Sequence, residues 1–144
     1  MRRILVVAHK TLGGKHLLEE VGRRMKGGDC RVHLVVPVNH PMGSFTEASL
    51  HHDAEKVLEE GLHRFRDLDS TGSIDITGEV GDANPIYATE VVRNRDEEFD
   101  EIIVSTLPHG VSRWILGDVP KKIQKVYPDA IVTHLVAEDE PAHA

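Results

Sequence analysis

The chain of 144 residues has one cysteine, Cys30, and only 4% aromatic residues. A single thiol cannot form an intramolecular disulfide, and without partner cysteines it does not indicate a metal site. We expect Cys30 to be a small buried residue at the start of a strand. No apolar run approaches the length of about 18 residues that spans a bilayer, and the first residues show no signal-peptide pattern. We therefore expect a cytoplasmic protein that has no membrane contact.

Positive charge is also scarce. The 17 Lys and Arg residues are outnumbered by 24 Asp and Glu residues, and the formal net charge is -7. Such a charge repels phosphate backbones, and no cluster of Lys and Arg on one predicted face compensates for it, so we exclude nucleic acid as a partner. The length and the 40% of hydrophobic residues fit a single globular domain over residues 1–144, in which 137–144 form a frayed acidic tail.

Histidine is the one residue type in excess, with ten copies scattered along the chain. A helical metal site needs ligands four residues apart or a tight cluster with acidic or thiolate partners. His51 and Glu55 have that spacing, in a helix whose other face is solvated. We expect no bound metal.

Runs of strand-like apolar pattern alternate with segments of helical spacing. Strands are predicted at residues 3–8, 31–36, 73–80, 102–105 and 131–136. Helices are predicted between them, from residue 15 to Gly27, from 48 to 68, from 85 to 95 and from 118 to 127. Asn84 should cap the third helix, with Pro85 at its first position, and Asp118 should cap the fourth.

This alternation predicts an α/β fold, a Rossmann-like, doubly wound, five-stranded parallel sheet with helices on both faces. Ligands bind such sheets beyond the carboxyl ends of the strands, where the winding direction reverses. Other nucleotide and phosphate sites of this class do not match. The chain has no acidic pair after the first strand, as a receiver domain needs, and the Gly13-Gly14-Lys15 segment lacks the P-loop spacing. A Gly-x-Gly-x-x-Gly turn is also missing.

The sequence resembles the universal stress protein family over its whole length. The resemblance is carried by the opening strand 3–8, the Gly81-Asp82 turn with Pro85 soon after, and the strand 101–104 followed by the loop to Gly117-Asp118-Val119. It is most similar to a bacterial subgroup with the loop Ser-Thr-Leu-Pro-x-Gly-x-Ser-Arg-Trp, here Ser105 to Trp114. The resemblance implies strand order 3-2-1-4-5, dimerisation through the edge strand Ile131–Val136 and, in some members, binding of ATP or AMP.

The chain departs from the phosphate-binding loop of the nucleotide-binding members, Gly-x2-Gly-x9-Gly-Ser/Thr. Ser105 and Pro108 stand at the first two glycines, the spacer to Gly117 has eight residues, and Asp118 replaces the hydroxyl residue. Pro108 removes an amide donor, and Asp118 brings negative charge to the place of a phosphate. His9 stands where those members have an acidic residue that contacts the nucleotide. No cofactor is required on this interpretation, and ATP or AMP remains a candidate ligand.

The predicted ligand-binding residues gather at the carboxyl ends of the strands. They are Ala8, His9, Thr11, Pro37, Gly81, Asp82, Ser105, Thr106, His109, Gly110, Ser112, Arg113 and Gly117. Arg113 can hold a phosphate or carboxylate bidentately, or form a surface ion pair. The hydroxyls of Ser105 and Thr106 can bind a ligand or satisfy the strand-end backbone. Trp114 can stack on a base or close the loop as part of the core.

Three functions remain open on the sequence alone. The first is a non-catalytic dimer that binds a small anionic ligand, such as an adenine nucleotide, and changes its association with partners when filled. The second is an interaction module without a ligand. The third is a hydrolase of nucleotides or phosphoesters with His9 or His109 as acid and base, although the segment around Ser112 lacks the last glycine of a nucleophile elbow.

Overall fold

The computed structural model describes residues 2–9, 11–26, 29–38, 46–95, 98–106 and 118–136, with Glu47 described by its backbone alone. The strands are β1 (Arg2–Val7), β2 (Cys30–Pro37), β3 (Asp75–Gly81), β4 (Glu101–Thr106) and β5 (Ile131–Val136). The helices in these ranges are α1 (Lys15–Met25), α2 (Glu47–Asp67), α3 (Pro85–Asn94) and α5 (Val119–Val126). The tail predicted at 137–144 lies outside the described residues.

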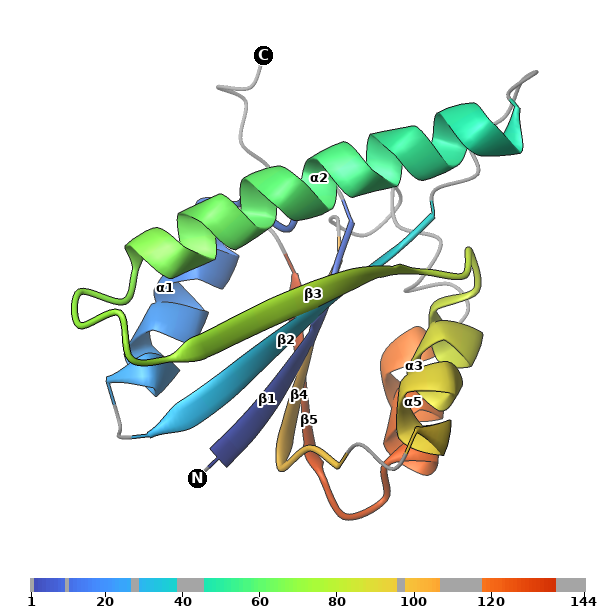
Figure 1. Cartoon of the computed structure of the whole chain (residues 1–144). Coiled ribbons are helices and arrows are strands. Elements are labelled where there is room, and N and C mark those ends of the chain that lie inside the picture. Colours follow the sequence, from blue (N-terminus) through green and yellow to red (C-terminus); the bar gives the residue numbers. More distant parts are fainter. Residues whose placement is uncertain are drawn as a thin grey trace.

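The strands form one five-stranded sheet in the order β3-β2-β1-β4-β5, and every neighbouring pair is parallel. Figure 1 shows the twisted sheet with α1 and α2 on one face and α3 and α5 on the other. The predicted fold class is therefore confirmed. None of the helices in the described ranges combines the length and the apolar character that a bilayer crossing needs.

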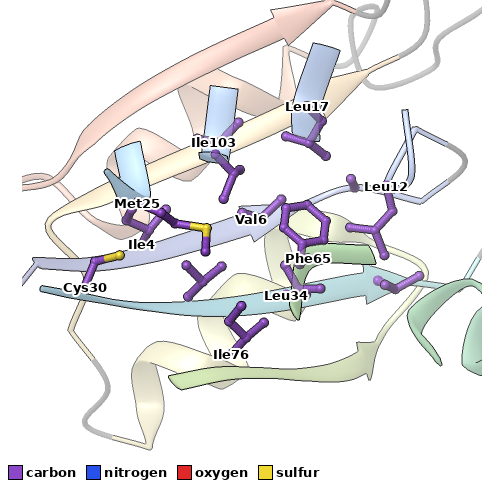
Figure 2. Packing of buried hydrophobic residues seen from close by; sticks show 14 of the residues in the cluster. Ile4, Val6, Leu12, Leu17, Met25, Cys30, Leu34, Phe65, Ile76 and Ile103 are labelled. Atoms are coloured by element: carbon purple, nitrogen blue, oxygen red, sulfur yellow. The ribbon is translucent and has the colours of Figure 1, made fainter. Parts of the chain in front are cut away.

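One hydrophobic core lies between the sheet and the α1/α2 layer. Ile4 and Val6 of β1 alternate toward this face, where they meet Leu17 of α1 and Phe65 of α2 (Figure 2). These four side chains are at most 1% exposed. Cys30 is 4% exposed in the same cluster, so its predicted place at a strand start is confirmed.

A second core lies on the opposite face. It joins Leu5 and Val7 of β1 to Val92 of α3 and Ile123 of α5, all fully buried. Because β1 is covered on both faces, it reads in sequence as a continuous apolar run. Each such buried side chain contributes about 1.5 to 3 kcal/mol to folding.

Ion pairs hold the end of α1 to the amino edge of the sheet. Arg24 Nη1 donates to Glu101 Oε1 at 2.6 Å, and Arg2 Nη1 donates to Glu101 Oε2 at 3.1 Å. Arg24 also pairs with Glu20 at 2.8 Å and contacts Thr133 Oγ1 at 3.4 Å. Glu101 is the first residue of β4, one position before the predicted strand 102–105.

The two predicted helix caps have different outcomes. Asn84 Oδ1 accepts from Ile86 N at 3.0 Å and from Tyr87 N at 3.4 Å, which confirms the cap of α3. Asp118 precedes α5, but its side chain forms no capping hydrogen bond, so that part of the prediction is wrong. The reason is backbone geometry: Asp118 is left-handed, with φ 55° and ψ 41°, whereas a capping residue is extended.

Candidate functional site

The carboxyl ends of β1 and β4 meet at the point where the winding direction reverses. From β1 the chain proceeds to β2 and β3 on one side of the sheet, and β4 and β5 lie on the other. Thr11 Oγ1 and Ser105 Oγ bridge these ends at 2.7 Å. Both residues are buried, at 7% and 3% exposed. Two of the predicted site residues, 94 positions apart in sequence, are thus in direct contact.

A second buried hydroxyl, on the opposite face of the sheet, is paired with a histidine ring. Neighbouring strand residues alternate, so Thr106 points away from Ser105. Thr106 Oγ1 lies 2.7 Å from His134 Nε2, and Thr106 is 2% exposed. His134 was not among the predicted site residues. The β4/β5 register, in which Thr106 faces Val136, would have placed His134 on the same face of the neighbouring strand.

The turn after β1 brings the next predicted residues to the carboxyl ends of the strands. Ala8 is fully buried, and its amide donates to Val35 O at 3.2 Å. His9 O accepts from Leu12 N at 3.1 Å, and Thr11 O accepts from Gly14 N at 2.9 Å. Both ring nitrogens of His9 are buried. This compact turn places Thr11 opposite Ser105 and leads directly into α1.

The residues predicted from the end of β3 form a separate group, and Pro37 of β2 lies between them and the β1 exit. Pro37 is buried and paired in register with Gly81, and Val38 N donates to Gly81 O at 3.0 Å. Asp82 Oδ2 accepts from Asn84 N at 2.8 Å. With neighbouring strands about 4.8 Å apart, β3 lies about 10 Å from β1 and about 14 Å from β4. Gly81 and Asp82 instead line a pocket of about 400 Å³ beside α3.

The remaining predicted site residues, His109, Gly110, Ser112, Arg113 and Gly117, lie outside the described residues. The described chain resumes at Asp118 and the first turn of α5. Pro120 stands within that turn and has no amide hydrogen to offer a ligand. The first turn of α5 therefore presents fewer donors than an ordinary helix N-terminus.

The described residues contain no group of three His, Cys, Asp or Glu side chains that could hold a metal ion. His51 and Glu55, the pair with metal-ligand spacing, face each other at 3.8 Å on the surface of α2, with about half of each side chain exposed. They are an ordinary helical pair one turn apart.

The described structure thus defines a doubly wound α/β protein whose strand ends at the winding reversal carry buried, paired hydroxyl groups. No protein-family model and no curated protein matches the sequence. Solved structures do match. A hypothetical protein aligns with 14% identity over 96% of this chain and 99% of its own, with a TM-score of 0.62.

Two similar structures are universal stress proteins with a nucleotide. A family member from Arabidopsis thaliana with AMP bound has 15% identity, covers 96% of this chain and 93% of its own, and has a TM-score of 0.57. A universal stress protein in complex with cAMP has 14% identity, covers 96% of this chain and 98% of its own, and has a TM-score of 0.53. The chain therefore has the fold of the universal stress proteins.

Proposed function

We propose that this chain is a non-catalytic, universal-stress-protein-like dimer that binds a small anionic ligand, an adenine nucleotide foremost, at the exit of β4. The observation that carries the proposal is the pair Thr11 and Ser105, whose hydroxyls bridge the two strand ends at the winding reversal. Ligands of doubly wound sheets bind at this place. Two proteins of the same fold are described with AMP and cAMP, which supports an adenine nucleotide as the first ligand to test.

We expect a monophosphate to bind more tightly than ATP. Asp118 and Pro108 stand where nucleotide-binding family members have a hydroxyl residue and a glycine. The carboxylate of Asp118 would repel each added phosphate, and Pro108 and Pro120 remove amide donors that a polyphosphate would use. AMP or cAMP needs fewer of these donors.

Titration calorimetry with AMP, cAMP and ATP, combined with thermal unfolding, tests the binding proposal. A ligand at 100 times its Kd should stabilise the fold by about 2.7 kcal/mol. Arg113→Ala should weaken AMP binding if Arg113 holds the phosphate, whereas Arg31→Ala, at the amino edge of the sheet, is the matched control. Absence of binding by all three nucleotides would refute the nucleotide form of the proposal.

The proposed dimer uses β5, which is an edge of the sheet and, among the residues that the structure describes, pairs only with β4. Its outer backbone groups are open to pairing with a second copy, and Ile131 is 68% exposed. Light scattering should give about twice the chain mass of 16.0 kDa. Ile131→Lys should shift the mass toward one chain, and Leu68→Lys, an exposed apolar control at 38%, should not. A single-chain mass at micromolar concentration contradicts the dimer.

The hydroxyl pairs also favour a second candidate, an interaction module without a ligand. Thr11, Ser105 and Thr106 already have hydrogen-bonding partners within the protein, so they can act purely as structural groups. On that alternative, no nucleotide shifts the melting temperature, while Ser105→Ala still lowers it. Because Ser105→Ala lowers the melting temperature on either candidate, it is the response of the wild-type protein to the nucleotides that separates the two.

A further inference from the structure

The pocket beside α3 has a composition opposite to that of an anion site. It is formed by four parts of the chain: the end of β2, the first turns of α2, the end of β3 with its following turn, and α3. Most of the residues that line it are apolar. Its polar side chains are those of His51, Glu79, Asp82 and Tyr87, two of which are carboxylates, and there is no Lys or Arg among the described lining residues. We propose that this pocket binds a small organic cation, an ammonium group carried on an apolar or aromatic body.

The apolar part of the pocket fits such a body. Val38, Leu50 and Val80 contribute aliphatic surface, and Tyr87 and Val91, one turn apart on α3, continue it to the rim. Tyr87 is 53% exposed and Val91 37%. The volume of about 400 Å³ lies in the range of small-molecule sites. An aromatic or aliphatic body of modest size would cover both exposed side chains.

The charged part of the pocket selects for a cation. Glu79 is already neutralised, because both of its oxygens accept from Arg95 Nη2, at 2.7 and 2.6 Å. Asp82 differs. One of its oxygens accepts the amide hydrogen of Asn84, and within the described part of the chain it forms no ion pair. The net charge of the lining is therefore negative, and its uncompensated charge lies at Asp82.

Tyr87 gives the same site a second means of holding a cation. The face of an aromatic ring attracts an ammonium group within about 6 Å, by about 0.5 to 1 kcal/mol at an exposed position. Tyr87 and Asp82 both line the pocket and belong to adjoining segments, the turn after β3 and the first turn of α3. A carboxylate and a ring at one pocket are the partners that an ammonium group on an apolar body requires.

Binding of 2-phenylethylammonium, followed by amide chemical shifts in NMR, tests this proposal, with 3-phenylpropionate and 2-phenylethanol as matched probes. We expect saturable shifts at residues 79–83 and 87–91, with a Kd in the low millimolar range or tighter. The anion should bind at least about fivefold more weakly than the ammonium. Equal binding of the ammonium, the alcohol and the anion would overturn the cation assignment, and absence of saturable shifts would overturn the site.

Three variants locate the charge and the ring. Asp82→Asn and Tyr87→Leu should each weaken ammonium binding about twofold to fivefold. Val91→Lys places a competing ammonium group at the rim and should abolish binding, without disturbing the core because Val91 is partly exposed. Asp75→Asn, an exposed carboxylate at the other end of β3, is the control and should leave the affinity unchanged. If Asp82→Asn also leaves it unchanged in a folded protein, the proposal fails, whatever the result with nucleotides.

Discussion

Gly61 of α2 lies so close to Leu12 that a β-carbon at residue 61 would stand 2.3 Å from Leu12 Cδ2 and 2.8 Å from Leu12 Cγ. Leu12 is fully buried and belongs to the turn that carries Thr11. The absence of a side chain at Gly61 therefore allows α2 to pack down on the turn after β1. The position of one helix and the geometry of the candidate site depend on the same contact.

We predict that Gly61→Ala destabilises the protein, although alanine is the better helix former by about 1 kcal/mol. The steric conflict with Leu12 should outweigh that gain and give a net loss of about 1 to 3 kcal/mol in urea unfolding. Gly22→Ala in α1 is the control, because its nearest neighbour would be 3.9 Å away, and it should be neutral or stabilising. Equal effects of the two substitutions would show that α2 does not pack in this way.

The hydroxyl pair at the winding reversal predicts a strong energetic coupling. Thr11→Val and Ser105→Ala each remove one partner and leave the other hydroxyl buried and unsatisfied, at a cost of about 1 to 3 kcal/mol. The double variant should cost clearly less than the sum, because no unpaired hydroxyl remains. Additive losses in the unfolding free energy would mean that the two hydroxyls do not form a hydrogen bond in solution.

The ion pairs at the amino edge predict a loss of stability in acid. Burial by itself would raise the pKa of Glu20, but the hydrogen bond and charge of Arg24, together with Arg23, hold that pKa below its ordinary value of 4.5. The folded protein therefore favours the ionised carboxylate. Its contribution to stability is present above pH 4.5 and is lost as the pH falls through the lowered pKa.

Glu20→Gln should flatten the dependence of unfolding free energy on pH below 4.5, measured by urea unfolding at a series of pH values. Glu19→Gln is the neighbouring control. Glu19 is 62% exposed, and its ion pair with an exposed lysine is long, at 3.9 Å, so it should contribute little to stability. A pH profile for Glu20→Gln that follows the wild type would contradict the assignment of this carboxylate.

Cys30 should be chemically inert in the native protein. Burial raises the pKa of its thiol above the ordinary value of 9.0, and the nearby charge of Arg2 offsets this only in part. Reaction with a thiol reagent at pH 8 should be at least about tenfold slower than in denaturant, because both access and thiolate content are lower. Rapid stoichiometric labelling of the folded protein would show that Cys30 is not buried in solution.

Much of the fold could be predicted because local signals and packing agree. The apolar run of β5 has the predicted bounds Ile131–Val136, and Asn84 caps α3 before Pro85 as its residue types indicate. The predicted strand 102–105 begins one residue late, because Glu101 is charged and its partners, Arg2 of β1 and Arg24 of α1, are distant in sequence. Asp118 was misread because its residue type favours a cap but does not reveal a left-handed backbone.

From the sequence, the candidate site could be predicted only as lying at the carboxyl ends of the strands. The alternation of strands and helices places Thr11, Ser105 and Gly81 at the carboxyl ends of the strands, but their separation follows only from the strand order, which the resemblance implied. The sheet order puts β3 at the far side, so Gly81 and Asp82 belong with α3 and its pocket instead of with Ser105. The pairing of the hydroxyls, and the contact between Thr106 and His134, depend on side-chain directions that only the structure supplies.

The clamp of Arg2, Arg24 and Glu101 lies at the end of the sheet opposite the strand exits that carry the candidate site. The ion pairs and the proposed binding site are thereby placed at opposite ends of the strands. We therefore expect substitutions at the strand exits to leave these ion pairs in place, so that the binding chemistry could change while the scaffold persists.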